Sequence, residues 1–320
     1  MMPRVVVTRP IPAAALELLA KHAELWVSAE DRPLGVAELH EAVRGADAVV
    51  TLLHDRVDDA FLNAAGAALR VVANVAVGVD NVDVEACRAR GVIATNTPGV
   101  LTDATADLAL ALILMVTRRL GEGERLLRRG ERWSWSMTFH LGRGLGGKTL
   151  GVVGLGQIGT ATARRCRALG MEVAYAGRRR APADVERELE ARFLPVEELL
   201  AVSDVVSLHC PLTPETRHLV DGAALRSMKP SAFLVNTTRG PVVDEGALVE
   251  ALRAGVIAGA GLDVFEHEPD VHPGLLELEN VVLLPHLGSA TVETREAMAV
   301  LAARNVVAVL AGEAPPTPVT

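Results

Sequence analysis

The chain has 320 residues, enough for about two domains, and half of its residues are hydrophobic, so it can bury a sizeable core. A net charge of −8 argues against a general affinity for nucleic acid. The longest apolar run, Leu108–Val116, is too short to span a bilayer, and the N-terminal sequence lacks the apolar core of a signal peptide, so we expect no membrane association.

The three cysteines, Cys87, Cys166 and Cys210, lie far apart, and none belongs to a CxxC pair. We therefore expect buried free thiols rather than a metal site or a disulfide framework. Free thiols suit the reducing cytoplasm, which is the expected location.

The first hundred residues alternate between short apolar runs and Ala/Leu/Glu-rich segments with helical spacing. Strands that alternate with helices predict a parallel sheet covered on both faces. Strands buried on both faces are continuous apolar runs, as observed here. The expected strands are Arg4–Thr8, Leu25–Val27, Ala48–Leu53, Arg70–Val75 and Val92–Thr95, and the expected helices are Ala13–Lys21, Ala37–Arg44 and Val82–Arg90.

One long apolar helix is predicted over Thr102–Leu120, and a Gly/Arg/Trp-rich stretch follows it. A second α/β series then begins at Lys148 and ends with a helix at Val292–Leu310. We expect an α/β protein with two doubly wound parallel-sheet domains, one at residues 99–284 and one assembled from residues 1–98 and 285–320. The later strands are expected at Thr149–Val153, Glu172–Tyr175, Val205–His209, Ala232–Asn236, Ala258–Asp263 and Val281–Leu284.

The sequence GLGQIG at positions 154–159 follows an apolar strand pattern and precedes a helical pattern that starts at Thr160. This is the GxGxxG motif in the strand–turn–helix context typical of dinucleotide binding; without that context it would be weak evidence. Gly154 permits the tight turn, Gly156 lets the backbone approach a pyrophosphate, and Gly159 allows close packing of helix on strand. The N–H groups at the start of the helix attract phosphate, so we expect an NAD(P)-binding Rossmann domain.

The strand after the glycine loop ends in a basic run that includes Arg178 and Arg179. An NAD-preferring site usually has an acid near this point to bind the ribose 2′-hydroxyl. Here no acid occurs between Glu172 and Asp184, and guanidinium groups pair well with phosphate. The run therefore predicts a preference for NADPH, with NADH possible; the alternative is a solvated basic surface.

Three further motifs close predicted strands and contain Arg239, Glu268 and His286. Ligands of open α/β sheets bind outside the carboxyl ends of the strands, so these residues can converge there. Reduction of a 2-oxo acid needs an anchor for the carboxylate, a polarised carbonyl and a proton for its oxygen. Arg239 could bind and polarise the substrate, and His286 could donate the proton. Glu268 could orient the imidazole and favour its charged form.

Each of these residues also has an ordinary interpretation. One arginine among 29 is usually a surface charge, a glutamate before a proline can be simply part of a loop, and most histidines are structural. Only their joint placement at three strand ends favours catalysis. Spacing alone does not exclude Glu266 and His267, which lie in the same motif as Glu268, as the catalytic residues of that motif.

The motifs GLGQIG, VNTTRGPVVDEGAL, GLDVFEHEP and LLPHLGSAT together resemble the D-isomer-specific 2-hydroxyacid dehydrogenase family, over nearly the whole chain. The segments NVAVGVDNVD and NTPGVLTDATAD are most similar to its glyoxylate/hydroxypyruvate reductases. The resemblance implies a flavodoxin-like substrate domain, a homodimer formed through the cofactor domain, and catalysis by Arg239, Glu268 and His286. It chooses Glu268 over Glu266 by analogy.

The resemblance also assigns binding roles. Val77 and Gly78 match the backbone amides that hold the substrate carboxylate, and Leu53 matches a pocket wall. An aromatic in some relatives reaches the partner's pocket, as Trp135 or Phe139 could. The residues that match cofactor contacts, including the glycine loop and the two arginines, are Thr105, Gly154, Gly156, Gln157, Ile158, Gly159, Arg178, Arg179, Cys210, Pro211, Thr216, Thr237, Asp263 and Gly288.

The function expected from these features is NADPH-dependent reduction of small 2-oxo acids to D-2-hydroxy acids, with glyoxylate and hydroxypyruvate as substrates and no metal. Formate dehydrogenases of similar sequence lack the glutamate that Glu268 provides. The alternatives are another dehydrogenase, such as a 2-ketogluconate reductase or a phosphoglycerate dehydrogenase, and a non-enzymatic NAD(H)-sensing module.

Overall fold

The computed structural model describes residues 2–319 and divides into two compact units. The first unit runs to Leu101 and resumes at Ser289, and the second comprises Thr102–Gly288. The expected boundaries, residues 98 and 284, lie close to these. Two parallel α/β sheets confirm the predicted fold class. No helix among the described residues is long and apolar enough to cross a membrane.

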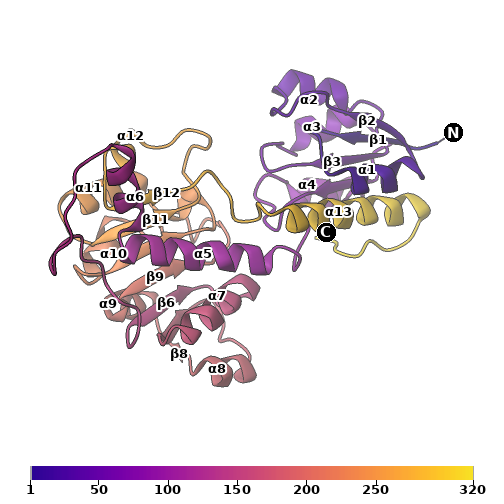
Figure 1. Ribbon diagram of the computed structural model, residues 1–320. Coiled ribbons are helices and arrows are strands. Elements are labelled where there is room, and N and C mark those ends of the chain that lie inside the picture. Colours follow the sequence, from indigo (N-terminus) through magenta and orange to yellow (C-terminus); the bar gives the residue numbers. More distant parts are fainter. Residues whose placement is uncertain (1, 320) are drawn as a thin grey trace. The chain divides into compact units, whose positions relative to one another are not determined.

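The first unit contains a five-stranded parallel sheet in the order β2-β1-β3-β4-β5, which is the flavodoxin-like order. Its last helix, α13 (Val292–Ala311), returns from the end of the chain and packs on α1 and the sheet (Figure 1). The strands are β1 (Arg4–Val7), β2 (Glu24–Val27), β3 (Ala48–Thr51), β4 (Val71–Asn74) and β5 (Ile93–Thr95), and the other helices are α1 (Ala13–Ala20), α2 (Val36–Ala42), α3 (Asp59–Ala65) and α4 (Val84–Ala89).

The second unit contains a seven-stranded parallel sheet in the order β12-β11-β10-β9-β6-β7-β8. This is the Rossmann order 3-2-1-4-5-6 with one further strand. The edge strand β8 (Arg192–Phe193) has only two residues, too few to give a sequence pattern. The other strands are β6 (Thr149–Val153), β7 (Glu172–Ala176), β9 (Val205–Leu208), β10 (Phe233–Asn236), β11 (Gly259–Leu262) and β12 (Val281–Leu283).

The long helix expected up to Leu120 is interrupted. Helix α5 (Thr102–Thr117) ends two residues before Arg119, whose φ of 56° is in the left-handed region, and α6 (Leu120–Arg128) follows. The apolar pattern continues through the break, so hydrophobicity alone gives no sign of it. The remaining helices are α7 (Gln157–Ala168), α8 (Ala183–Leu189), α9 (Val196–Val202), α10 (Gly222–Ser227), the 3-10 turn η1 (Gly240–Val242), α11 (Glu245–Arg253) and α12 (Pro273–Leu276).

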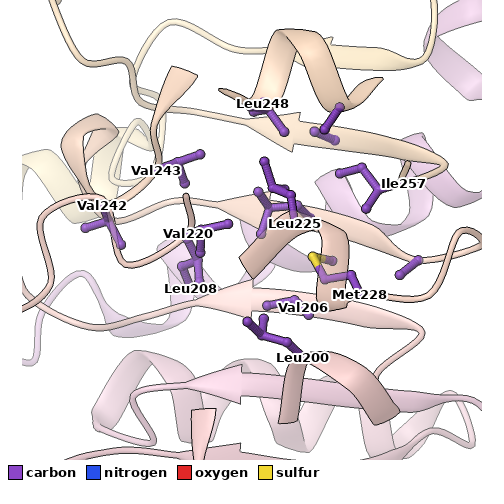
Figure 2. Packing of buried hydrophobic residues seen from close by; sticks show 14 of the residues in the cluster. Leu200, Val206, Leu208, Val220, Leu225, Met228, Val242, Val243, Leu248 and Ile257 are labelled. Carbon is purple, nitrogen blue, oxygen red and sulfur yellow. The ribbon is translucent and has the colours of Figure 1, made fainter. Parts of the chain in front are cut away.

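One face of the second sheet packs against the helices that connect β9, β10 and β11. Figure 2 shows the buried cluster between them, which includes Leu208 and Val206 from β9, Leu225 of α10 and Leu248 of α11. The strands are parallel, so their carboxyl ends share one edge of the sheet. The loops that follow β6, β10, β11 and β12 at that edge carry the residues considered next.

Candidate active site

Arg239 follows β10 and is held by its own loop. The amide Nδ2 of Asn236 donates to the carbonyl of Arg239 (2.9 Å), and Asn236 Oδ1 accepts from the N–H and the hydroxyl of Thr238 (3.0 and 2.8 Å). The guanidinium Nη1 donates to the Thr238 carbonyl (2.9 Å). Asn236 is 1% exposed, and its importance was missed in the sequence, although an Asn at a strand end is a common turn-forming signal.

Glu268 and His286 are brought into direct contact. Glu268 Oε2 lies 2.8 Å from His286 Nδ1, and Glu268 Oε1 accepts from the backbone N–H of Phe265 (3.0 Å). Burial by itself would raise the pKa of Glu268, but His286, the Phe265 N–H and the charge of Arg239 together hold this pKa below its usual value. A carboxylate on Nδ1 leaves Nε2 of the imidazole available to a substrate.

Glu266, the competitor that spacing left open, has different partners. Its Oε1 lies 2.7 Å from His218 Nε2, and its Oε2 accepts from the backbone N–H of Glu245 (3.1 Å). The two carboxylates of the motif therefore engage two different histidines. His267, the other competitor, has an exposed side chain between them.

The backbone of His286 has a φ of 53°, an uncommon conformation for a residue with a side chain. Asp263 stabilises it from the end of β11. Its carbonyl accepts from His286 N–H (2.9 Å), and its two carboxylate oxygens accept from the N–H groups of Leu287 (2.7 Å) and Gly288 (2.8 Å). Burial raises the pKa of Asp263 to about 6, against the effect of these two hydrogen bonds.

The glycine loop fits a dinucleotide. Helix α7 starts at Gln157, three residues before its expected start, so Gly159 lies in its first turn, and a Cβ on Gly159 would stand 2.3 Å from the Gly154 carbonyl oxygen. Gly156 caps the helix without a side-chain hydrogen bond, and a Cβ built there would meet nothing within 4 Å. The first N–H groups of the helix thus face an open cradle in which a pyrophosphate could bind.

The basic run after β7 separates into two parts. Arg180 pairs with Glu186 (Nη2 to Oε2, 3.1 Å) and lies over the ring of Phe193. Arg178 and Arg179 are exposed and form no ion pair with any residue in the described range 2–319. Two guanidinium groups beyond the β7 end are thus available to an anionic ligand.

The other candidate cofactor residues lie around the same sheet edge. Thr105 in α5 donates to the Gly288 carbonyl (3.2 Å), and Thr216 donates to the Pro211 carbonyl (2.6 Å) in the loop after Cys210. The hydroxyl of Thr237 is buried without a hydrogen-bond partner among the described residues, as expected of an atom that a cofactor would satisfy.

His209, at the end of β9, was not singled out in the sequence. Its Nε2 lies 2.8 Å from the Ser207 hydroxyl, its Nδ1 is buried with no partner among residues 2–319, and burial lowers its pKa to about 4. A Cβ on Gly154 would stand 2.8 Å from the His209 carbonyl, so the backbone of His209 packs directly against the glycine loop. The apolar strand before it gave no signal of this placement.

The candidate substrate residues Leu53, Val77 and Gly78 belong to the first unit. Leu53 follows β3, and Val77 and Gly78 follow β4, where the Gly78 carbonyl accepts from the side-chain amide of Asn74 (3.0 Å). The catalytic candidates, by contrast, all belong to the second unit.

Residues 110–288 match the sequence profile of the D-isomer specific 2-hydroxyacid dehydrogenase, NAD binding domain. A glyoxylate reductase from Thermococcus litoralis is 50% identical over 323 aligned positions, which cover 99% of this chain and 96% of the relative. The TT0316 protein from Thermus thermophilus has a crystal structure with a TM-score of 0.93 at 48% identity, covering 99% of this chain and 100% of that one.

A further solved relative is the NADPH-dependent glyoxylate/hydroxypyruvate reductase of Sinorhizobium meliloti, in complex with NADP and malonate. It is 36% identical with a TM-score of 0.87, and the match covers 100% of this chain and 97% of that chain. These matches extend over both units and confirm the resemblance carried by the sequence motifs. The chain belongs to the D-isomer-specific 2-hydroxyacid dehydrogenase family and is an NAD(P)-dependent dehydrogenase of the glyoxylate reductase type.

Proposed function

We propose that this enzyme reduces small 2-oxo acids to D-2-hydroxy acids with NADPH, and that glyoxylate and hydroxypyruvate are its substrates. The observation that carries the proposal is the contact between Glu268 Oε2 and His286 Nδ1, which lie 2.8 Å apart in the same unit as Arg239. The chain is also 50% identical in sequence to a glyoxylate reductase. In this proposal, Leu53 forms an apolar wall of the substrate site, and the neighbouring backbone amides of Val77 and Gly78 hold the carboxylate of a short acid.

Arg239 binds the substrate in this proposal. Its planar fork of donors can hold a carboxylate and the neighbouring carbonyl oxygen together, which anchors the acid and polarises the carbonyl. The bonds from Asn236 fix the backbone on both sides of Arg239, so less freedom is lost when the substrate binds.

His286 donates the proton. The nicotinamide, when bound, supplies the hydride that reduces the carbonyl carbon. The developing oxyanion takes a proton from Nε2 of His286, while Glu268 on Nδ1 keeps the ring oriented and stabilises its cationic form. The 2-hydroxy acid would thus carry both the hydride and the proton from His286.

We propose that NADPH is preferred because Arg178 and Arg179 bind the 2′-phosphate. Changing both residues to alanine should weaken NADPH binding about tenfold, because two exposed ion pairs of roughly 0.7 kcal/mol each, about 1.4 kcal/mol in total, are lost. NADH binding should change little. Fluorescence titration with both cofactors measures the effect.

Arg180→Ala is the matched control for that experiment, since Arg180 is engaged by Glu186 and Phe193. It should leave the ratio of the two affinities unchanged. Equal losses of NADPH and NADH binding in the double variant would refute the assignment of the two arginines.

The function itself is tested with a substrate panel. Loss of absorbance at 340 nm is followed for glyoxylate, hydroxypyruvate and 2-ketogluconate, each with NADPH and NADH. We expect the highest kcat/KM with glyoxylate or hydroxypyruvate and NADPH. Absence of turnover with every 2-oxo acid would favour a cofactor-sensing role instead.

The remaining parts of the proposal concern domains and assembly. The unit Thr102–Gly288 binds the cofactor, and the other unit binds the substrate carboxylate through the amides of Val77 and Gly78. Two copies form a homodimer through the cofactor domain. The exposed apolar side chains of Trp135 and Met137 in that domain support this assembly, because a partner would cover them. The three cysteines are free and buried, which fits the reducing cytoplasm.

A further inference from the structure

We propose that Glu266 is a positioning residue of this reaction. With Glu245 and His218 it fastens the loop that carries Arg239 to the loop that carries Glu268. This inference rests on the proposed reductase function. We call the three side chains Glu266, Glu245 and His218 the loop clamp.

The loop after Arg239 is fixed in the core of its unit. Val242 and Val243 are 0% and 1% exposed, and Figure 2 shows both among the buried side chains of the cluster. Val243 also forms a parallel bridge with Val220. A movement of this loop would therefore disturb packing that is already dense, so it provides a stable support.

The Glu268 loop lies directly against that support. A Cβ built on Gly240 would stand 1.8 Å from the carbonyl carbon of Phe265 and 2.3 Å from the nitrogen of Glu266. No side chain fits between these backbones. The two loops are therefore in contact at Gly240, which is one residue after Arg239, and at Phe265, which is three residues before Glu268.

Glu266 and Glu245 then exchange two hydrogen bonds across this contact. Glu266 N–H donates to Glu245 Oε1 (2.6 Å), and Glu245 N–H donates to Glu266 Oε2 (3.1 Å). Glu245 is 4% exposed and is the first residue of α11, after the N-cap Asp244. Charge-assisted hydrogen bonds are stronger than neutral ones, so this reciprocal pair holds the loops together against the repulsion between the two carboxylates. Burial and the neighbouring Glu266 carboxylate raise the pKa of Glu245.

His218 adds a third segment to the clamp. Its side-chain Nε2 lies 2.7 Å from Glu266 Oε1, and its backbone N–H donates to the Pro241 carbonyl (2.8 Å). Its φ of 52° is an uncommon conformation that these two contacts stabilise. His218 therefore holds Glu266 on one loop and Pro241 on the other.

The consequence concerns the catalytic candidates. Glu268 Oε1 accepts from the N–H of Phe265, the residue that touches Gly240, and Glu268 Oε2 contacts His286. The clamp thereby sets the separation between the guanidinium of Arg239 and the imidazole of His286. Both must reach one small substrate, and a misplacement of about 1 Å can cost roughly a hundredfold in rate.

The test compares Glu266→Ala with Glu266→Gln and with His267→Ala, a control on an exposed side chain in the same loop. Glu266→Ala should lower kcat/KM for glyoxylate roughly 10- to 100-fold, with NADPH affinity unchanged. Glu266→Gln should recover most activity, because its amide oxygen can accept from Glu245 N–H and its amide nitrogen can donate to His218 Nε2. His267→Ala should behave as the unaltered enzyme.

Two measurements exclude a merely structural effect. In the Glu266→Ala variant, measured as the full chain, amide hydrogen exchange should be faster than in the unaltered enzyme in peptides covering residues 239–246 and 264–269. The melting temperature of both proteins is measured as well. His218→Ala provides a second variant, and its combination with Glu266→Ala should be no worse than Glu266→Ala alone, because both break the same contact.

The outcomes separate the two proposals. No turnover by the unaltered enzyme would refute the proposed function, and the exchange data would then decide alone whether Glu266 fastens the loops. Unchanged kcat/KM in Glu266→Ala would overturn the positioning role. A loss of NADPH affinity in step with turnover would overturn it too, because a general loss of structure would then explain both.

Discussion

The imidazole of His286 is held through its side chain and its backbone at once. Glu268 binds Nδ1, while Asp263 binds the N–H groups of Leu287 and Gly288 and so maintains the left-handed φ of His286. Such a conformation costs of the order of 1 kcal/mol or more for a residue with a side chain. Its persistence here is explained by the three hydrogen bonds that Asp263 accepts, two at its carboxylate and one at its carbonyl.

Replacement of His286 by alanine should remove proton transfer only. We expect kcat for reduction to fall roughly 10²- to 10⁴-fold, the usual contribution of a placed acid, with NADPH affinity unchanged. Stopped-flow single turnovers measure this fall in rate; turnover retained in His286→Ala would assign the proton to another group.

Asp263 should make stability depend on pH. Its pKa is about 6 in the fold against 3.8 in the unfolded chain, so the folded protein holds a proton that the unfolded chain releases between these values. The contribution of this group to the free energy of unfolding is therefore greatest below pH 3.8 and is lost as the pH rises through 6, by roughly 3 kcal/mol in total.

Asp263→Asn removes this titration. Between pH 4 and pH 7 the unaltered apo-protein should lose up to that amount of unfolding free energy, whereas the variant should not. The variant therefore gains stability relative to the unaltered protein as the pH rises. Urea midpoints at several pH values measure it. A difference that is constant with pH would contradict the elevated pKa of Asp263.

At the scale of elements, the glycine loop combines two requirements that can be separated. Gly159 is needed for packing, because a Cβ there would collide with the Gly154 carbonyl, whereas Gly156 faces open space. Gly159→Ala should destabilise the apo-protein by about 1–3 kcal/mol, as overpacking usually does. The fall in melting temperature by calorimetry measures this cost.

Gly156→Ala is the matched variant. It should leave the melting temperature nearly unchanged, since the loss at an N-cap glycine is below about 1 kcal/mol. Affinity for NADPH should fall, because the new methyl group occupies the cradle. A stable Gly156→Ala protein with full cofactor affinity would show that the pyrophosphate binds elsewhere.

For the whole molecule, one short stretch stands out because it carries several exposed apolar side chains close together in sequence. Trp133, Trp135, Met137 and Leu141 are each more than half exposed in the segment between α6 and β6. A net charge of −8 favours solubility but does not cover such a surface. Large apolar patches commonly mark interfaces, and a second copy of the chain is the proposed partner.

Sedimentation velocity tests the dimer. The unaltered protein should sediment as a dimer, and the double change Trp135→Glu, Met137→Glu should give monomers, because buried unpaired charges oppose association. Val36→Glu, at a side chain that is 72% exposed in the first unit, is the control and should stay dimeric. A monomeric unaltered protein would refute the proposal.

Much of the architecture follows from the sequence alone. Continuous apolar runs alternating with helical patterns determined two parallel sheets, since burial on both faces requires such runs. The GxGxxG motif indicated a Rossmann unit, and strand ends gave the edge where Arg239, Asp263 and His286 lie. These features are local, because residue type and period encode which elements form and which of their faces are buried.

The partners of the two glutamates were decided only by the tertiary structure. Glu266 and Glu268 are two residues apart in one motif, yet one contacts His218 and the other His286. That difference depends on hydrogen bonds and backbone contacts between the loops at Arg239, Glu268 and His286, which are distant in sequence. Loop conformation is fixed by such long-range contacts, so no local sequence pattern predicts it. The strands that precede these loops, by contrast, are predicted by their own residues.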